Sequence, residues 1–387
     1  MGSSQSRRQF LQAGLALPAA AGFTASSPGG LNAVLQGSSK VEYRTMGKTG
    51  LKVSSVGYGI GFNPIPEVVA RAIDMGVNYF DTARAYGDSE KIFAGVIKGK
   101  RDKIHIATKT SSHTKEAILK DIETSLATLG TDYVDIWHIH GLDTWKEAPD
   151  NIPDEVLDAM VQCKKSGKAR FIGFSCHDPN KMVDFVLKTK VFEVMQPTYS
   201  FAIGAHYRDA AIKRLHETGM GFSAMKVVVA LSGLNLKSID NPPARPEGEG
   251  PLAGIKWVLN NPAISTTVPF MQKVSELEMN FRAMSEPYTP VDEQLLFVLN
   301  EQIRPYYCRM CFSCSGACPK GLPVADMLRF LAYNDFAGNY YQAKSNFRDL
   351  TKEIRDVRCS ECSSCAIKCP NGVQVQARLN RAQEILA

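Results

Sequence analysis

This sequence of 387 residues has few cysteines over most of its length, no long apolar run and no large excess of positive or negative charge. Only Cys163 and Cys176 precede residue 300. No stretch of about 18 uninterrupted apolar residues occurs, so the sequence predicts no membrane-spanning helix and no stable membrane anchor. The net charge of +6 is modest for this length, and the basic residues are scattered, which argues against a nucleic-acid partner.

The other eight cysteines form two groups near the end of the chain, each with the spacing C-x-x-C-x-x-C-x-x-x-C-P. Disulfide frameworks spread their cysteines to join distant loops, whereas this tight spacing brings thiolates to one metal centre. It is the spacing of bacterial two-cluster ferredoxins and predicts two [4Fe-4S] clusters. Zinc is the alternative, but zinc sites usually consist of two C-x-x-C pairs. The predicted ligands are Cys308, Cys311, Cys314, Cys318, Cys359, Cys362, Cys365 and Cys369.

The fourth cysteine of each group stands three residues away and precedes a proline, so we expect it to bind the other cluster. One cluster would then take Cys308, Cys311, Cys314 and Cys369, and the other would take Cys359, Cys362, Cys365 and Cys318. In the alternative arrangement each group holds its own cluster. The segment between the groups has a helical pattern, so residues 307–387 resemble an α-helical ferredoxin domain.

The N-terminal segment has the layout of an export signal. Arg7 and Arg8 precede a short, Ala-rich apolar run, which predicts a twin-arginine signal over residues 1–30 and export to the periplasm. A Ser/Gly-rich linker is predicted over residues 31–41. The alternative is an unstructured start in which the arginine pair occurs by chance. No cysteine lies near this segment, so we expect no lipoprotein anchor.

Between residues 42 and 285, short apolar strands alternate with amphipathic helical stretches. About eight such units favour an α/β fold of the closed (β/α)8 TIM-barrel type over an open sheet. Prolines mark a connecting segment over residues 286–306, with a helix expected around Val291–Ile303. The expected strands lie at 53–58, 77–80, 104–107, 134–139, 170–174, 192–195, 221–225 and 264–268.

Polar side chains occur where several of these strands end. Asp81 ends the second strand, Lys109 the third and His140 the fourth, and Tyr86 follows shortly after Asp81. In a barrel, reactive groups gather at the C-terminal ends of the strands. An acid, a phenol, an ammonium and an imidazole should therefore face one opening.

At these residues the chain resembles the aldo-keto reductase family. The resemblance covers roughly residues 42–285, and the F-D-T-A-x-x-Y-G run at 80–87 is its most specific part. It implies that Tyr86 is the general acid that protonates a carbonyl oxygen, and that His140 orients this carbonyl. It also implies that Asp81 pairs with Lys109, whose charge should favour the tyrosinate form of Tyr86.

The same resemblance implies a nicotinamide cofactor, NADP or NAD. Tyr199 aligns with the tyrosine on which the family stacks the nicotinamide, and Ser175 and Gln196 align with the groups that hold its carboxamide. Lys226 ends the seventh strand and is a candidate for the cofactor phosphates. Asn280 aligns with a residue that contacts the adenine.

The sequence therefore predicts an oxidoreductase of the aldo-keto reductase type, which interconverts a small-molecule carbonyl and an alcohol. Two [4Fe-4S] clusters would serve electron transfer or structure, with a redox partner protein as a candidate donor. A hydride carries two electrons while each cluster accepts one, and no flavin motif is present to mediate between them. The alternative is an exported electron-transfer protein whose barrel is a docking body with little reductase activity.

Overall fold

The computed structural model describes residues 40–145, 148–203, 207–229, 231 and 249–387. The signal predicted over residues 1–30 lies outside these residues, as does nearly all of the linker predicted over 31–41. Within the described ranges, no helix combines the length and the apolar character that crossing a membrane requires.

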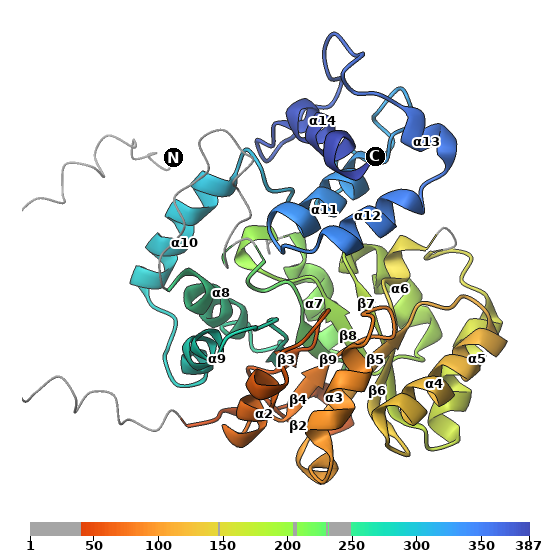
Figure 1. The fold of residues 1–387 in the computed structure, drawn as a ribbon, viewed down its shortest axis with the longest axis vertical. Helices are drawn as coiled ribbons and strands as arrows, with labels where there is room; N and C mark the ends of the chain where they lie inside the picture. The colour runs from red at the N-terminus through yellow and green to blue at the C-terminus, as the bar shows by residue number, and fades with distance from the viewer. Residues whose placement is uncertain (1–39, 146–147, 204–206, 230, 232–248) are drawn as a thin grey trace, which may run out of the picture. The chain divides into compact units, whose positions relative to one another are not determined.

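Eight parallel strands form one sheet in the order of the sequence (Figure 1). Isolated parallel bridges from Val56 to Thr267 and from Gly59 to Phe270 connect the beginning of this sheet to its end. The observed arrangement is that of the predicted (β/α)8 barrel. Its strands are β3 (Tyr58–Gly59), β4 (Tyr79–Asp81), β5 (His105–Thr110), β6 (Val134–Ile139), β7 (Ala169–Cys176), β8 (Val194–Pro197), β9 (Gly221–Ala224) and β10 (Thr266–Thr267).

A helix follows each strand and packs on the outside of the barrel. In α4, Thr114 caps the first turn by accepting a hydrogen bond from Ala117 N, and Gly130 ends the helix in the left-handed conformation. The expected apolar face of this helix is buried at Ile118, Ile122 and Leu126. The helices are α2 (Pro66–Asp74), α3 (Ser89–Ile97), α4 (Lys115–Leu129), α5 (Asp154–Lys165), α6 (Pro179–Thr189), α7 (Asp209–His216), α8 (Gly250–Leu259) and α9 (Val274–Phe281).

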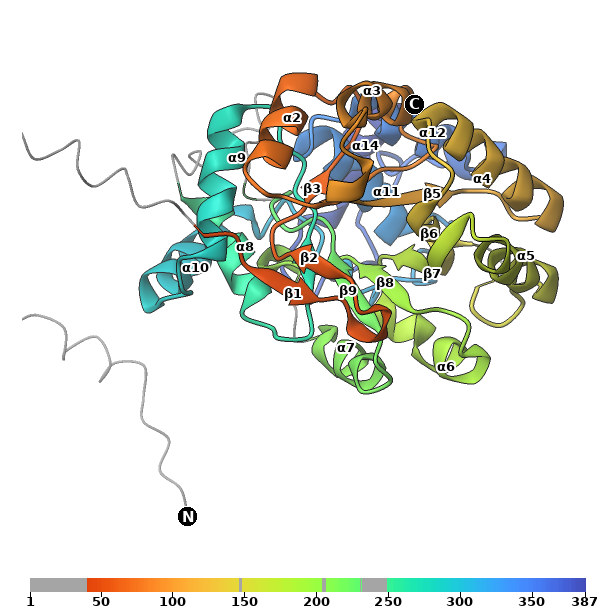
Figure 2. The same ribbon diagram turned by 90° about the horizontal axis from the view of Figure 1, so that it is seen from below.

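The first predicted strand, at 53–58, is wrong in its bounds. Strand β2 (Lys52–Ser54) pairs antiparallel with β1 (Tyr43–Thr45), and only β3 belongs to the barrel. The Asn78 side chain accepts a hydrogen bond from Ser54 N and donates one to Lys52 O, which joins the hairpin to the residue before β4. Apolar side chains of this hairpin region pack under the barrel, on the side away from the C-terminal helices (Figure 2).

The C-terminal part of the chain is helical. Helix α10 (Pro290–Ile303) begins with a capping box between Thr289 and Asp292 and coincides with the expected connecting helix. The helical pattern expected between the cysteine groups corresponds to α11, α12 and α13, and α14 follows the second group. These helices are α11 (Val324–Asp335), α12 (Tyr340–Arg348), α13 (Lys352–Asp356) and α14 (Val375–Leu386).

The barrel and the C-terminal helices belong to one compact unit and contact each other through buried arginines. Arg208, at the start of α7, donates hydrogen bonds to the carbonyl oxygens of Ile203, His177 and Met310 at 3.0–3.1 Å. Arg309 reaches back to the carbonyl oxygen of Ala202. Because Met310 lies between the first two cysteines of the first group, this group is held close to the barrel.

Candidate active site

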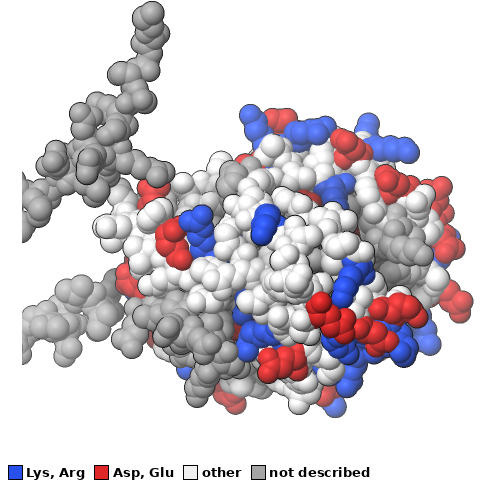
Figure 3. Space-filling model, turned by 90° about the horizontal axis from the view of Figure 1, so that it is seen from above, with Lys and Arg blue, Asp and Glu red and all other residues white. Residues whose placement is uncertain are grey.

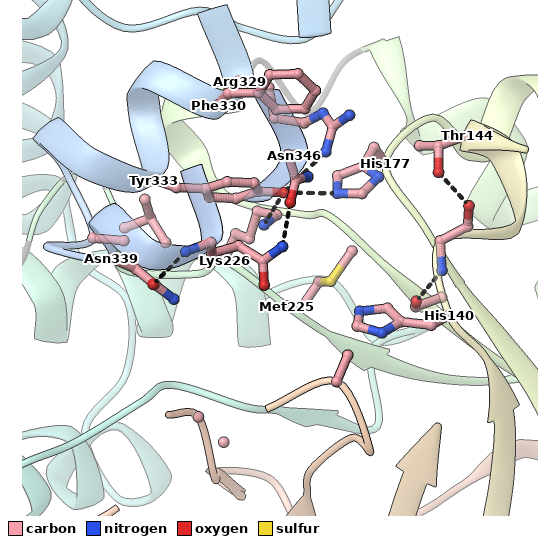
Figure 4. A pocket seen from close by; sticks show the side chains of 18 of the residues that line it. His140, Thr144, His177, Met225, Lys226, Arg329, Phe330, Tyr333, Asn339 and Asn346 are labelled. Carbon is pink, nitrogen blue, oxygen red and sulfur yellow. Dashed lines mark hydrogen bonds between the residues drawn. The ribbon is translucent and has the colours of Figure 1, made fainter. Parts of the chain in front are cut away.

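A cavity of about 1670 Å³ lies between the C-terminal ends of the barrel strands and helices α11 and α12. Both parts of the chain supply its walls (Figure 4). The barrel contributes Asp81, Tyr86, His140, Ser175 and Gln196, and the C-terminal helices contribute Arg329, Phe330, Tyr333, Asn339 and Asn346.

Asp81 and Lys109 form a buried ion pair at the floor of this cavity. Lys109 Nζ donates to Asp81 Oδ2 at 2.6 Å and to the carbonyl oxygen of Thr82 at 2.7 Å. Burial raises the pKa of Asp81, although the charge of Lys109 opposes this shift, and burial lowers the pKa of Lys109. The expected pairing of these two residues is therefore present.

Tyr86 and His140 lie above this pair. Their rings meet edge to face with centroids 5.6 Å apart, and Lys109 Nζ is 5.6 Å from the centre of the Tyr86 ring. His140 Nδ1 lies 3.4 Å from Ser111 Oγ, which leaves Nε2 for a ligand. Burial, followed by the charge of Lys109, holds the pKa of His140 well below its usual value, so the imidazole is neutral at pH 7.

The protonation of Tyr86 differs from the expectation. We expected Lys109 to favour the tyrosinate, but burial raises the pKa of Tyr86 well above its usual value, and Asp81 raises it further. The reason is that Lys109 is already paired, so its charge is balanced by Asp81. Tyr86 is therefore a neutral phenol at pH 7 and a proton donor.

Four of the five predicted cofactor residues line the cavity: Ser175, Gln196, Lys226 and Asn280. Ser175 Oγ accepts a hydrogen bond from Gly141 N at 2.8 Å. Gln196 Nε2 is buried and has no hydrogen-bond partner among the described residues. Asn280 is buried on α9.

Tyr199 is placed differently from the prediction. It does not line the cavity; its ring stacks on Trp257 with centroids 5.3 Å apart, and its hydroxyl donates to Asp209 at 2.8 Å. The residue follows β8 by two positions, and its side chain packs among the outer helices. At the end of the neighbouring strand β9, Met225 lines the cavity instead.

Sequence reasoning missed the contribution of the C-terminal helices to this site. Arg329 and Tyr333 lie four residues apart on α11, hydrogen-bond to each other at 3.1 Å and face the barrel. His177 and Asp143, from the loops after β7 and β6, also line the cavity. The signal for α11 was available, because Arg329 and Tyr333 stand at helical spacing between apolar residues of this helix.

The eight cysteines approach each other across the two groups. The electrostatic neighbours of Cys308 are Cys311, Cys314 and Cys369, and those of Cys359 are Cys362, Cys365 and Cys318. Asn371, two residues after Cys369, donates to Cys311 Sγ at 3.2 Å. Lys320, two residues after Cys318, donates to the carbonyl oxygen of Arg358 and to Glu361.

These thiols are not joined by disulfides in the part of the chain that the structure describes. Burial raises the pKa of Cys308 to about 12 and that of Cys359 to about 11. As the side chains stand, no three or more His, Cys, Asp or Glu residues within the described ranges form a group that could hold a metal ion.

Comparison with known proteins shows what the barrel is similar to. Residues 63–253 match the model of the Aldo/keto reductase family. L-galactose dehydrogenase of Arabidopsis thaliana is 36% identical over 157 residues, which is 35% of this chain and 49% of that protein. L-glyceraldehyde 3-phosphate reductase of Escherichia coli strain K12 is 26% identical over 213 residues, 47% of this chain and 60% of that protein. The chain spans about half the length of the curated relatives it matches.

Solved structures show the same fold. An aldo-keto reductase from Klebsiella pneumoniae, solved in complex with NADPH, superposes with a TM-score of 0.55 at 22% identity. The superposition covers 67% of this chain and 95% of that protein.

Proposed function

We propose that the chain, whose residues 63–253 match the model of the Aldo/keto reductase family, interconverts a carbonyl and an alcohol with a nicotinamide cofactor. The observation that carries the proposal is the meeting of Tyr86, His140 and the Asp81–Lys109 pair at one cavity. These groups can donate a proton to a carbonyl oxygen and orient it, which is the work of a general acid site.

A nicotinamide nucleotide fits this cavity in part. Gln196 Nε2 is a buried donor without a partner among the described residues, and Ser175 lies beside it on the same wall. Both can hold a carboxamide, while Lys226 and Asn280 are available to the rest of the nucleotide. The bound nucleotide would supply or accept the hydride. Tyr86, kept protonated by burial, would give its proton to the substrate oxygen, and His140 Nε2 would hold that oxygen in place.

The substrate proposed for this site is a hydroxylated carbonyl compound of the sugar type. Two of the relatives are named for acting on L-galactose and on L-glyceraldehyde 3-phosphate. The cavity wall from α12 presents the amides of Asn339, Gln342 and Asn346, which can hydrogen-bond several hydroxyl groups. Trp145 and His113, whose rings stack with centroids 3.7 Å apart, also line the cavity.

Replacement of Tyr86 tests the proposal. Tyr86→Phe should lower kcat about 10²- to 10⁴-fold and leave the affinity for the nucleotide nearly unchanged, because the hydroxyl acts only on the reacting oxygen. The matched control is Tyr43→Phe in the β1 hairpin, remote from the cavity, which should keep full turnover. Wild-type turnover of Tyr86→Phe with a working substrate would refute the assigned role.

We also propose that the C-terminal domain holds two [4Fe-4S] clusters in the crossed arrangement. The support is that Cys369 lies with the first cysteine group and Cys318 with the second. A cubane is larger than a single ion and holds its four thiolates farther apart, so two groups of four cysteines suit it. Iron, sulfide and zinc contents of the purified protein separate this proposal from a zinc site.

A redox partner protein for these clusters is part of the proposal. Seen from the side of the C-terminal domain, charged groups of both signs surround a surface whose middle carries few of them (Figure 3). Such a patch with a polar rim suits a transient protein contact. NADH or NADPH alone should leave the clusters oxidised, because transfer of single electrons from the nicotinamide to a cluster would pass through an unfavourable nicotinamide radical. Rapid anaerobic bleaching of the clusters by either nucleotide would contradict the need for a partner.

Export through the twin-arginine route is proposed from Arg7 and Arg8. Replacing both by lysine keeps the positive charge and removes the arginine pair. The variant should remain in the cytoplasm as a longer precursor. Unchanged fractionation in the native host would refute the proposed signal.

A further inference from the structure

Tyr333 brings a second phenol into the barrel cavity, from helix α11 of the C-terminal domain. Its hydroxyl oxygen lies 3.1 Å from Arg329 Nη1, 3.3 Å from Lys226 Nζ and 3.3 Å from His177 Nε2 (Figure 4). Lys226 also stands over the ring, 4.4 Å from its centre. Three nitrogen groups, two of them from the barrel, therefore converge on one oxygen atom.

The hydrogen-bonding capacities of these groups determine where the proton of Tyr333 can go. Lysine and arginine side chains only donate hydrogen bonds, so Lys226 and Arg329 occupy the acceptor sites of the phenol oxygen. His177 Nε2 is the contact that can accept the phenolic proton. The other nitrogen of this ring, Nδ1, faces Asp143 at 3.6 Å.

Asp143 is held as a carboxylate behind His177. Its oxygens accept hydrogen bonds from the backbone N–H groups of His177 and Asp178 at 2.8–3.0 Å. Burial alone would raise the pKa of Asp143, but these hydrogen bonds and His177 lower it. A carboxylate in this position stabilises an imidazolium on His177.

The two phenols of the cavity have opposite surroundings. Burial raises the pKa of Tyr86, and Asp81 adds to the effect. Burial would also raise the pKa of Tyr333, but the charges of Lys226 and Arg329 lower it well below its usual value. Pairs of titratable groups whose surroundings separate their pKa values are typical of acid and base assignments.

We propose that Tyr333 is a second acid–base residue of the barrel cavity, contributed by the C-terminal domain, with His177 as its proton acceptor. In this step the Tyr333 O–H bond breaks and an N–H bond forms at His177 Nε2, which gives a phenolate and an imidazolium with no change in net charge. The phenolate is stabilised by Lys226 and Arg329, and the imidazolium by Asp143.

Three further titratable groups lie around Tyr333, and none of them cancels the positive charge near its hydroxyl. On α11 itself, Asp326 accepts from Arg329 Nη2 at 2.8 Å and balances part of the charge of this arginine. Tyr86, across the cavity, and Tyr307, before the first cysteine group, are both neutral at pH 7 because burial raises the pKa of each. None of them removes the excess of positive charge at the Tyr333 hydroxyl.

The proposal goes beyond the function proposed above. Tyr86 would serve as the proton donor to the reacting carbonyl, and the Tyr333–His177 pair would hold a second, separate proton in the same cavity.

The ionisation of Tyr333 can be measured without any substrate. The full-length protein is labelled with ¹³Cζ-tyrosine, and the resonances of its 13 tyrosines are followed against pH. One tyrosine should ionise at least about tenfold more readily than a free phenol, whose pKa is near ~10. This titration should be absent in Tyr333→Phe and present in the control Tyr340→Phe, which removes a partly exposed tyrosine of α12.

Lys226→Met keeps Tyr333 and removes one of its cations, so the same titration should move to higher pH. The proposal is overturned if no tyrosine ionises below about pH 10, or if the early titration persists in Tyr333→Phe. Should Tyr333→Phe fail to fold, an unchanged titration in folded Lys226→Met overturns it as well. An early titration without any carbonyl turnover would refute the proposed function and leave this inference standing.

Discussion

The barrel and the C-terminal domain differ in how many cysteines their apolar cores contain. Among its buried apolar residues the barrel core has two cysteines, Cys163 and Cys176. The smaller core of the C-terminal domain includes Cys308 and Cys359, with four other cysteines packed against it. Its buried Asp335 is paired with Arg378 and Arg381. If the cysteines bind a metal, we expect the C-terminal domain to depend on it for folding more than the barrel does.

The largest expected difference between the barrel and the C-terminal domain is their response to the removal of iron. If the cysteines hold clusters, metal binding is part of the folding free energy of the C-terminal domain. Chelation of iron from the full-length protein should then increase hydrogen exchange in α11 and α14 by more than about tenfold, while strands β5 to β7 stay protected. Equal protection of α14 before and after chelation would show that the domain does not need its metal.

The crossed arrangement predicts which cluster each cysteine serves. Cys369→Ala should alter the paramagnetic resonance signal of the cluster on Cys308, Cys311 and Cys314. The matched variant Cys365→Ala, from the same group, should alter the other signal first. If Cys369→Ala disturbs only the cluster on Cys359 and Cys362, each cysteine group holds its own cluster and the crossed arrangement is wrong.

The smallest expected effect is the pH-dependent contribution of Asp135, in the barrel, to the free energy of unfolding. This carboxylate pairs with Arg101 and Arg170 at 2.8 and 2.7 Å, and His105 Nδ1 lies within 3.3 Å. Burial would raise the pKa of Asp135, but the hydrogen bond from His105 and the charge of Arg101 lower it to about 2. Relative to an ordinary aspartate, this shift corresponds to about 2 kcal/mol of stability at pH 7.

Because the folded-state pKa of Asp135 is lowered, its stabilisation is complete above the unfolded pKa of about 4 and is lost as the pH falls towards 2. The difference in unfolding free energy between wild type and Asp135→Asn should therefore be constant from about pH 7 to 5 and shrink below about pH 4. The exposed Asp132→Asn is the control and should change stability little. A difference that grows as the pH falls would contradict this assignment.

The sequence predicted most of the barrel because alternating apolar strands and amphipathic helices determine such a fold locally. It predicted that Asp81, Tyr86, Lys109 and His140 would meet, since strand ends of a parallel barrel share one side. It failed for Tyr199, because the direction of a side chain after a strand depends on packing against Trp257. It also failed for Arg329 and Tyr333, whose role depends on how the C-terminal domain docks on the barrel.

The protonation of Tyr86 was beyond sequence reasoning for a related cause. The motif indicates that a lysine lies near the phenol, but the balance between burial and charge depends on the positions of all neighbours. Lys109 is neutralised by Asp81, whereas the unpaired excess of positive charge lies at Tyr333.

We propose that a reductase barrel and a two-cluster domain form one protein. This is tested by the iron, sulfide and zinc content of the full-length chain, purified without oxygen. We expect about eight iron and about eight sulfide per chain, as two [4Fe-4S] clusters require. Stoichiometric zinc without sulfide would contradict it.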